Sequence, residues 1–216
     1  MFLRKYKTYL LSLSLMVTLL LMGLVYKSLN NGTGGARVLN SPVDGLIPLV
    51  PWMSLPYLGW YPFIFAAMAY LCLRDTRLYL RVLLAMNICL CVCYLIYAHF
   101  QTTVPRPVLS GSGLGTRLLR YVYSEDRPYN CFPSIHALHS YLVMRGVWAS
   151  RSVRRRYKLL ISAGSITIIA STLLIKQHVI YDAAAAALLG ETVFMLLGGI
   201  WIYKRRQLTK WRQRIN

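Results

Sequence analysis

A series of apolar runs, each close to the length that crosses a bilayer, constrains the fold more than any other feature. A helix needs about 20 apolar residues to span the hydrocarbon core. Of the 216 residues, 56% are hydrophobic and only six are acidic. Because backbone groups in hydrocarbon must be satisfied inside a helix, we predict an all-α integral membrane protein. Six runs are predicted to be spanning helices: 9–26, 57–73, 78–100, 134–149, 157–175 and 183–203.

The connections between these runs carry most of the 25 lysines and arginines. Six crossings place both termini on one side of the membrane, and that side collects the larger share of the basic residues. The positive-inside rule therefore predicts cytoplasmic termini. The loop 101–133 and the turn near His178 then face outward. A net charge of +19 in such a chain favours contact with anionic lipid headgroups over nucleic acid.

We predict a single membrane-embedded domain over 1–216, with the chemistry-bearing residues between 99 and 182. The proline-rich part of 27–56 is predicted to lie at the membrane interface, because proline disrupts a regular spanning helix. Four of the five cysteines lie within predicted spans. Cys131 alone lies in a polar region, and one thiol predicts no disulfide framework.

An ionisable cluster lies between the fifth and sixth runs, where Lys176, His178 and Asp182 fall within seven residues. Polar groups at this depth are costly and favour a functional interpretation. On a helix, residues four apart share a face, so the Asp182 carboxylate can hold one nitrogen of His178. An imidazole oriented in this way can act as a nucleophile or a base. A pair that only caps the helix is the alternative.

A second polar set lies at the start of the fourth run, where Ser134 precedes His136 by two residues, and Arg106 and His99 come from the preceding segment. Cations, a hydroxyl and a helix N-terminus suit a tetrahedral dianion. One imidazole can attack phosphorus while a second protonates the leaving oxygen. No cofactor and no metal are predicted, because carboxylate ligands are few and the His136–His139 spacing is not a H-E-x-x-H zinc motif.

Three blocks of the chain resemble the type 2 phosphatidic acid phosphatase superfamily, which shows K-x6-R-P, then P-S-G-H, then S-R-x5-H-x3-D. The chain has His99-x6-Arg106-Pro107, then Pro133-Ser134-Ile135-His136, then Ser171-Thr172-x5-His178-x3-Asp182. The resemblance implies that His178 forms a phosphohistidine, that Asp182 orients it and that His136 is the general acid. It also implies that Arg106 and Ser134 bind phosphate oxygens.

The chain departs from this pattern at three positions. His99 replaces the lysine of the first block, Ile135 a glycine, and Thr172 the arginine of the third block. We expect Lys176 to replace one missing cation and His99 to contact phosphate; Arg117, Arg120 and Arg127 are weaker candidates. These changes resemble the branch that contains inositol-phosphoceramide-synthase-like transferases.

The expected function is therefore hydrolysis of a lipid phosphomonoester or diphosphate at the outer face of a cell membrane. The expected partners are the bilayer and an anionic phospholipid or polyprenyl phosphate. A lipid phosphotransferase and a non-catalytic lipid-binding protein are the alternatives. The headgroup and the oligomeric state stay open.

Two predictions concern structural residues. Arg145 and Glu191 each lie nine residues beyond a site residue of their own helix, so they should have similar depth, ~13 Å below the site. We predict an ion pair between the fourth and sixth helices. His139, one turn below His136, is predicted to be a packed histidine with its hydrogen bonds satisfied.

Overall fold

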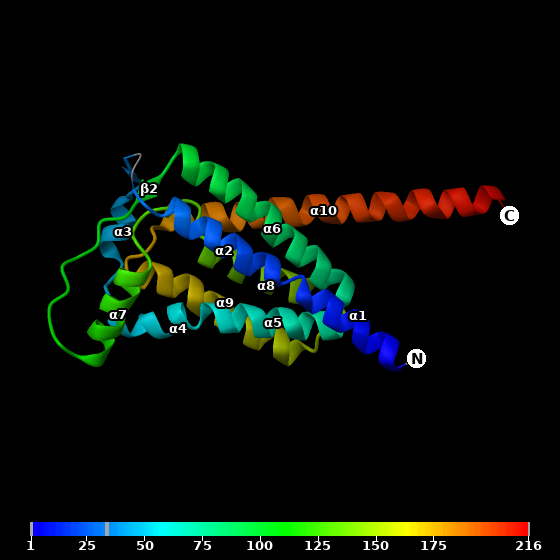
Figure 1. Ribbon diagram of the computed structural model, residues 1–216, viewed down its shortest axis with the longest axis horizontal. Helices are drawn as coiled ribbons and strands as arrows, with labels where there is room; N and C mark the ends of the chain where they lie inside the picture. The colour runs from blue at the N-terminus through cyan, green and yellow to red at the C-terminus, as the bar shows by residue number, and fades with distance from the viewer. Residues whose placement is uncertain (1, 33–34, 216) are drawn as a thin grey trace.

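The computed structural model describes residues 2–32 and 35–215, and these are mostly helical (Figure 1). The helices are α1 Phe2–Ser14, α2 Val17–Leu29, α3 Pro42–Leu46, η1 Pro51–Met53, α4 Ser54–Leu58, α5 Trp60–Arg74, α6 Thr76–His99, α7 Leu114–Glu125, α8 Ile135–Ala149, α9 Arg155–Leu174 and α10 Ile180–Ile215. Two short strands, β1 Arg37–Val38 and β2 Thr102–Thr103, pair in parallel. The all-α prediction is confirmed at this level.

Among the described residues, five helical stretches are long and apolar enough to cross a membrane. They are Tyr9–Leu29, Pro51–Arg74, Thr76–His99, Arg155–Leu174 and Ile180–Ile200. The remaining predicted span, the fourth run at 134–149, corresponds to α8, which has 15 residues and is therefore ~22 Å long. That length is less than the ~30 Å thickness of a typical hydrocarbon core.

The short helix α8 lies at the centre of the bundle and contacts α5, α6, α9 and α10. Its side chains Leu138, Leu142 and Val143 are fully buried. At Gly146 the neighbouring helix comes so close that an added Cβ would lie 2.4 Å from Val82 Cγ2. Burial against four neighbouring helices stabilises this weakly apolar helix inside the bundle, away from lipid.

Two helix boundaries differ from the prediction. The first run is divided into α1 and α2 by a turn at Leu15 and Met16, whose N–H groups bond to carbonyls three residues back. The last helix does not end near 203 but continues to Ile215 and projects beyond the bundle (Figure 1). Its basic, glutamine-containing end has a composition that favours helix, which the hydropathy pattern does not record.

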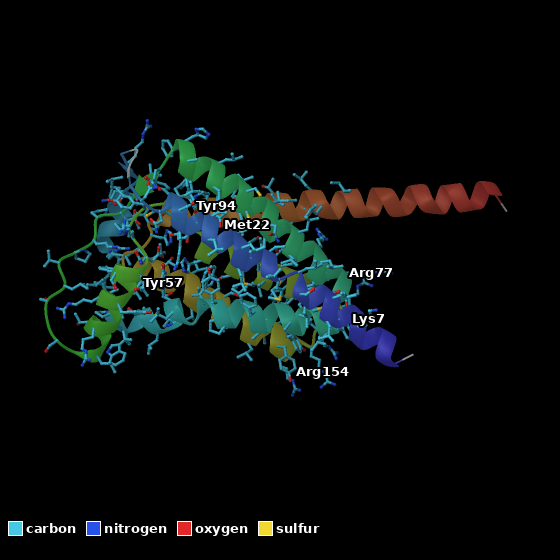
Figure 2. The ribbon with its side chains drawn as sticks, viewed as in Figure 1. Lys7, Met22, Tyr57, Arg77, Tyr94 and Arg154 are labelled. Carbon is cyan, nitrogen blue, oxygen red and sulfur yellow. The ribbon has the colours of Figure 1, made fainter. Side chains whose placement is uncertain are left out.

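The two ends of the bundle differ in character. Both termini lie at one end, and α3, β2 and α7 lie at the other (Figure 1). Lys7, Arg77 and Arg154 lie at the end that holds the termini (Figure 2). The side chains of Arg4, Lys5 and the basic residues of 204–214, on which the orientation prediction also depends, are outside the described part.

The predicted ion pair between the fourth and sixth helices is confirmed. Arg145 Nε lies 2.9 Å from Glu191 Oε2, joining α8 to α10. The hydroxyl of Tyr141 donates to the same carboxylate oxygen at 2.9 Å, and the Arg145 guanidinium lies over the Phe194 ring. The carboxylate is therefore held by two partners from α8.

We expect Glu191→Gln to lower the thermal unfolding midpoint in detergent by about 2–4 °C, because it leaves the Arg145 charge unpaired between two helices. Arg145→Gln should have a similar effect. The double variant should lose less than the sum of the two single losses, which is the signature of a coupled pair. Additive losses would mean that the two groups act independently.

Candidate active site

A cavity of about 600 Å³ lies at the α7 end of the bundle, between α2, α5, α6 and α8. Both His136, on the first turn of α8, and His178, in the turn between α9 and α10, line it. Their ring centroids are 6.0 Å apart. Blocks separated by 42 positions in the sequence are thus brought to one cavity.

Backbone contacts fix the two histidines relative to each other. The N–H of Ser134 donates to the carbonyl of Asp182 at 3.1 Å, which joins the start of α8 to the start of α10. Ser134 is the N-cap of α8, and its hydroxyl accepts from the Ala137 N–H at 3.3 Å. It is fully buried. Ser134 therefore holds the helix start and is not among the cavity-lining residues.

The pair predicted at the start of the last helix is formed. His178 Nδ1 lies 3.2 Å from Asp182 Oδ2, and both side chains are buried. The same oxygen accepts from the Val179 N–H at 3.0 Å. Because the carboxylate occupies the Nδ1 side, the other ring nitrogen, Nε2, is left for the cavity. Asp182 Oδ1 has no hydrogen-bond partner among the described residues.

Two aromatic rings, those of Tyr57 and Trp60, contact the His136 ring. The Tyr57 ring stacks on it at 4.3 Å with an interplanar angle of 25°, and the Trp60 ring lies 4.2 Å away. Trp60 also stacks on His139 at 5.5 Å. His139 is packed as predicted, but it is not satisfied: its Nε2 is buried without a hydrogen-bond partner in the described part.

The carboxylate of Asp126, at the end of α7, also lines this cavity and was not predicted. It accepts from the hydroxyls of Tyr26 at 2.9 Å and Tyr57 at 2.5 Å, and from the Asn30 amide at 3.1 Å. The contacts connect α2 and α4 to α7, and through Tyr57 they reach the His136 ring. The scarcity of acidic residues, six in the chain, is the sequence signal that identifies Asp126.

Arg106 lies behind the cavity wall and does not line it. Its guanidinium donates to the carbonyls of Tyr123, at 3.0 Å, and Asp126, and to the side-chain oxygen of Gln177. Burial lowers the pKa of Arg106 from its ordinary value, with the nearby Asp126 charge acting in the opposite direction. Arg106 therefore holds the end of α7 against the residue that precedes His178, and its Nε is buried without a partner in the described structure.

The structure does not bring Lys176 or His99 into the cavity. The Lys176 ammonium donates to the carbonyls of Asp44, at 2.9 Å, and Ile47. The Asp44 carboxylate in turn accepts from the Ile180 N–H at 2.9 Å. Lys176 thus secures the turn before α10 to the α3 segment. The sequence did not predict this role, because helical spacing does not reveal that 27–56 folds over this turn. His99 is exposed at the end of α6.

Two other basic residues do line the cavity, Lys27 on α2 and Arg127 after α7. Arg127 was a weaker sequence candidate and Lys27 was not considered. Both are exposed, so their side chains can move toward a bound anion. Among the described residues that line the cavity, they are the lysine and the arginine.

A thiol lies beside the histidine–aspartate pair. Cys131 is buried, and its Sγ, a carboxylate oxygen of Asp182 and a ring nitrogen of His178 lie within 4.8 Å of one another. Burial raises the pKa of the Cys131 thiol well above its ordinary value, and the Asp182 and Asp126 charges add to this. The sequence gave no indication of this proximity, because Cys131 and Asp182 are 51 positions apart.

Tyr57 provides a test of how His136 is positioned; it lies at the α4 end of the bundle, beside α7 (Figure 2). Tyr57→Phe keeps the ring stack but removes the hydrogen bond to Asp126. If the chain turns over a lipid phosphate, as the sequence leads us to expect, kcat should fall about tenfold. Tyr57→Leu removes both contacts and should cost more and alter the kcat–pH profile. Equal losses in the two variants, with unchanged pH profiles, would contradict positioning through the ring.

Comparison of the chain with protein families, with curated proteins and with solved structures gives no match. The function is therefore inferred from the geometry of the cavity.

Proposed function

We propose that this chain is a membrane enzyme that cleaves a phosphoester or diphosphate bond of a lipid through a phosphohistidine on His178. The observation that carries the proposal is the meeting of two histidines, 6.0 Å apart between ring centroids, in one cavity. One of them is held by a buried carboxylate. At that separation, one ring can attack phosphorus while the other protonates the oxygen that leaves.

In the first step His178 Nε2 attacks phosphorus, and the bond from phosphorus to the lipid oxygen breaks. The Asp182 carboxylate, 3.2 Å from Nδ1, keeps the proton on that nitrogen and stabilises the positive charge that develops on the ring. His136 gives its proton to the leaving oxygen. In the second step His136 takes a proton from water, the water oxygen attacks phosphorus, and the N–P bond breaks.

Charge neutralisation falls to groups other than those the sequence favoured. Lys27 and Arg127 line the cavity, and the start of α8 adds the partial positive charge of a helix N-terminus. We assign the phosphate oxygens to these groups. Arg106 acts behind them by holding the Asp126 carbonyl and Gln177 in place.

The shape of the cavity supports a lipid substrate. Its α2 wall changes from Lys27, Asn30 and Asn31 at one end to Gly23 and Leu19 at the other. Leu19, Gly23 and Lys27 follow one face of α2 over ~12 Å, and Asn30 and Asn31 come directly after the helix, which ends at Leu29. The lower part is completed by apolar residues of α5 and α6, including Ile64, Phe65 and Leu90. A hydrocarbon chain fits this apolar part while its phosphate lies between the histidines.

We place the cavity at the extracytoplasmic side of a cell membrane. In this arrangement α8 is a central crossing, in addition to the five longer spans. The basic residues Lys7, Arg77 and Arg154 lie at the opposite end, together with both termini (Figures 1 and 2). By the positive-inside rule that end is cytoplasmic. Cysteine substitutions near Val108 and near Arg154, labelled with an impermeant reagent in intact cells, test this: labelling near Arg154 alone would reverse the orientation.

The purified chain, incubated with a phosphatidate or polyprenyl diphosphate in EDTA, tests the reaction. Free phosphate release that needs no acceptor supports hydrolysis. Product that appears only when a lipid or sugar hydroxyl is added would replace hydrolysis by phosphotransfer from the same phosphohistidine. Binding of these lipids without either product would favour the non-catalytic alternative.

Gly23 tests the position of the lipid chain, because a Cβ at this residue would lie 3.3 Å from the Tyr61 hydroxyl. Gly23→Leu narrows the apolar part, and we expect kcat/KM for a long-chain lipid phosphate to fall about tenfold, the equivalent of two lost methylene contacts. A short-chain phosphate should be hydrolysed as before. Gly199→Leu is the control, since a Cβ there has no neighbour within 4 Å. Equal losses on both substrates would contradict this placement.

A further inference from the structure

We propose that Cys131, His178 and Asp182 form a binding site for a thiophilic divalent cation such as Zn²⁺, and that this ion inhibits the enzyme. A sulfur, an imidazole nitrogen and a carboxylate oxygen lie within 4.8 Å of one another, and all three residues are buried. Binding of the ion is independent of the proposed reaction, whereas inhibition rests on it.

The unused coordination capacity of Asp182 is the second observation. Its Oδ2 accepts from His178 and from the Val179 N–H, whereas Oδ1 is buried and has no hydrogen-bond partner in the described residues. Asp182 as a whole has no exposed surface. Buried carboxylate oxygens without a partner are rare, because each loses its hydration without replacement. Asp182 therefore has an acceptor that no described protein group uses, and this carboxylate can take a cation as a further partner.

The Cys131 thiol is free to take part. It forms no disulfide, and its Sγ donates a long hydrogen bond of 3.6 Å to the carbonyl of Pro128. The backbone around it is held: the Phe132 N–H donates to the Thr102 hydroxyl at 2.8 Å, and the Ser134 N–H donates to the Asp182 carbonyl at 3.1 Å. Cys131 is thus fixed against Asp182 by the main chain, and only side-chain rotation is needed to adjust the ligand distances.

The ligand set selects the metal. Thiolate, imidazole and carboxylate are ligands of Zn²⁺, whereas Mg²⁺ and Ca²⁺ require sites made of oxygen. Around a tetrahedral zinc ion with bonds of 2.0–2.3 Å, ligand atoms lie about 3.3–3.8 Å apart. The three groups therefore need to approach by ~1 Å, and the thiol proton is released to solvent. Three protein ligands leave the fourth position to water.

Occupation of this site removes the nucleophile. The ion takes a nitrogen of His178 and an oxygen of Asp182, the two groups whose contact orients the ring toward the cavity. The imidazole then no longer has the combination of a free Nε2 and a carboxylate-held Nδ1. The proposed reaction uses His178 and Asp182 but not Cys131. The thiol adds a third ligand, so a metal ion can bind to residues that otherwise act without one.

Cadmium titration of the full-length chain tests the binding. Protein freed of metal by EDTA and then of EDTA by gel filtration is titrated with Cd²⁺, and the thiolate-to-cadmium absorption in the ultraviolet is recorded. We expect a band that saturates near one equivalent in the wild type and is lost in Cys131→Ser. Cys91→Ser is the matched control, because Cys91 is exposed on α6 and should keep the band. A band of wild-type size in Cys131→Ser, or no band in the wild type, overturns the site.

Inhibition is measured separately. Zn²⁺ should inhibit phosphate release by the wild type, and Cys131→Ser should need at least about tenfold more Zn²⁺ for half-inhibition relative to its own metal-free rate. Inhibition that is equal in both proteins would contradict the role of the thiol. Because cadmium absorption does not need turnover, a failure of the proposed reaction leaves the spectral result decisive for the metal site.

Discussion

His178→Ala is expected to lower turnover of a lipid phosphate by about 10⁴–10⁶-fold, because it removes the atom that forms the bond to phosphorus. Its two described partners in the proposed reaction do not replace it: Asp182 is buried beside the ring, and His136 is held by contacts with Tyr57 and Trp60. The residual rate should reflect positioning and charge neutralisation only. Phosphate release and the labelling of the protein by a radioactive substrate should be lost together.

The control for this variant is Tyr181→Ala, a change at an exposed residue of the first turn of α10, three positions after His178. It should keep turnover within about twofold, since an exposed substitution away from packed contacts rarely matters. Both variants should unfold at temperatures close to that of the wild type. Turnover of His178→Ala at the wild-type rate would exclude the nucleophile assignment, whereas label that persists without turnover would place the bond to phosphorus on another residue.

The general architecture could be predicted from the sequence because hydrophobic length and spacing are local properties. Helical character, membrane-spanning length and the equal depth of Arg145 and Glu191 all follow from residue counts along single helices. The central position of α8 could not be derived in the same way. Its 15 residues are kept by burial among four helices, and burial depends on neighbours that are distant in the sequence.

The candidate site divides in a similar way. The motif spacing correctly predicted that His136, His178 and Asp182 lie together. Each block lies at or just before the start of a helix, and these two helices begin at the same end of the bundle. The roles of the cations could not be predicted, since the partner of a charged side chain depends on which segments the fold places beside it. Lys176 meets the carbonyls of Asp44 and Ile47, which belong to a segment whose path the apolar pattern does not determine.

The aromatic and acidic wall of the cavity was missed for a related reason. Tyr57 and Trp60 were interpreted as part of a membrane helix, and tyrosine and tryptophan are common at its ends. Only the fold shows that Tyr57 stacks on His136 and donates to Asp126. A rare carboxylate such as Asp126 in a basic chain indicates that the carboxylate has a specific hydrogen-bonding role. It does not indicate which residues donate to it.

His136→Gln should separate the two steps of the proposed reaction. With a lipid phosphate, whose alkoxide is a poor leaving group, loss of the general acid is expected to reduce turnover about 10²–10⁴-fold. With p-nitrophenyl phosphate the leaving group needs no proton, so attack by His178 should proceed. Hydrolysis of the phosphohistidine still requires a base, and His136 is the residue that supplies it.

The variant should therefore release a burst of about one equivalent of p-nitrophenolate and then slow sharply, while the phosphorylated protein accumulates. His178→Ala gives no burst, which makes it the control for attack by another residue. The geometry predicts this difference because the two imidazoles come from different segments, α8 and the turn before α10. They are held independently, one by Asp182 and the other by aromatic rings. Loss of one should thus leave the other in place. If His136→Gln shows no burst and loses aryl and lipid substrates to the same extent, while its unfolding midpoint is unchanged, His136 is not the proton donor to the leaving group.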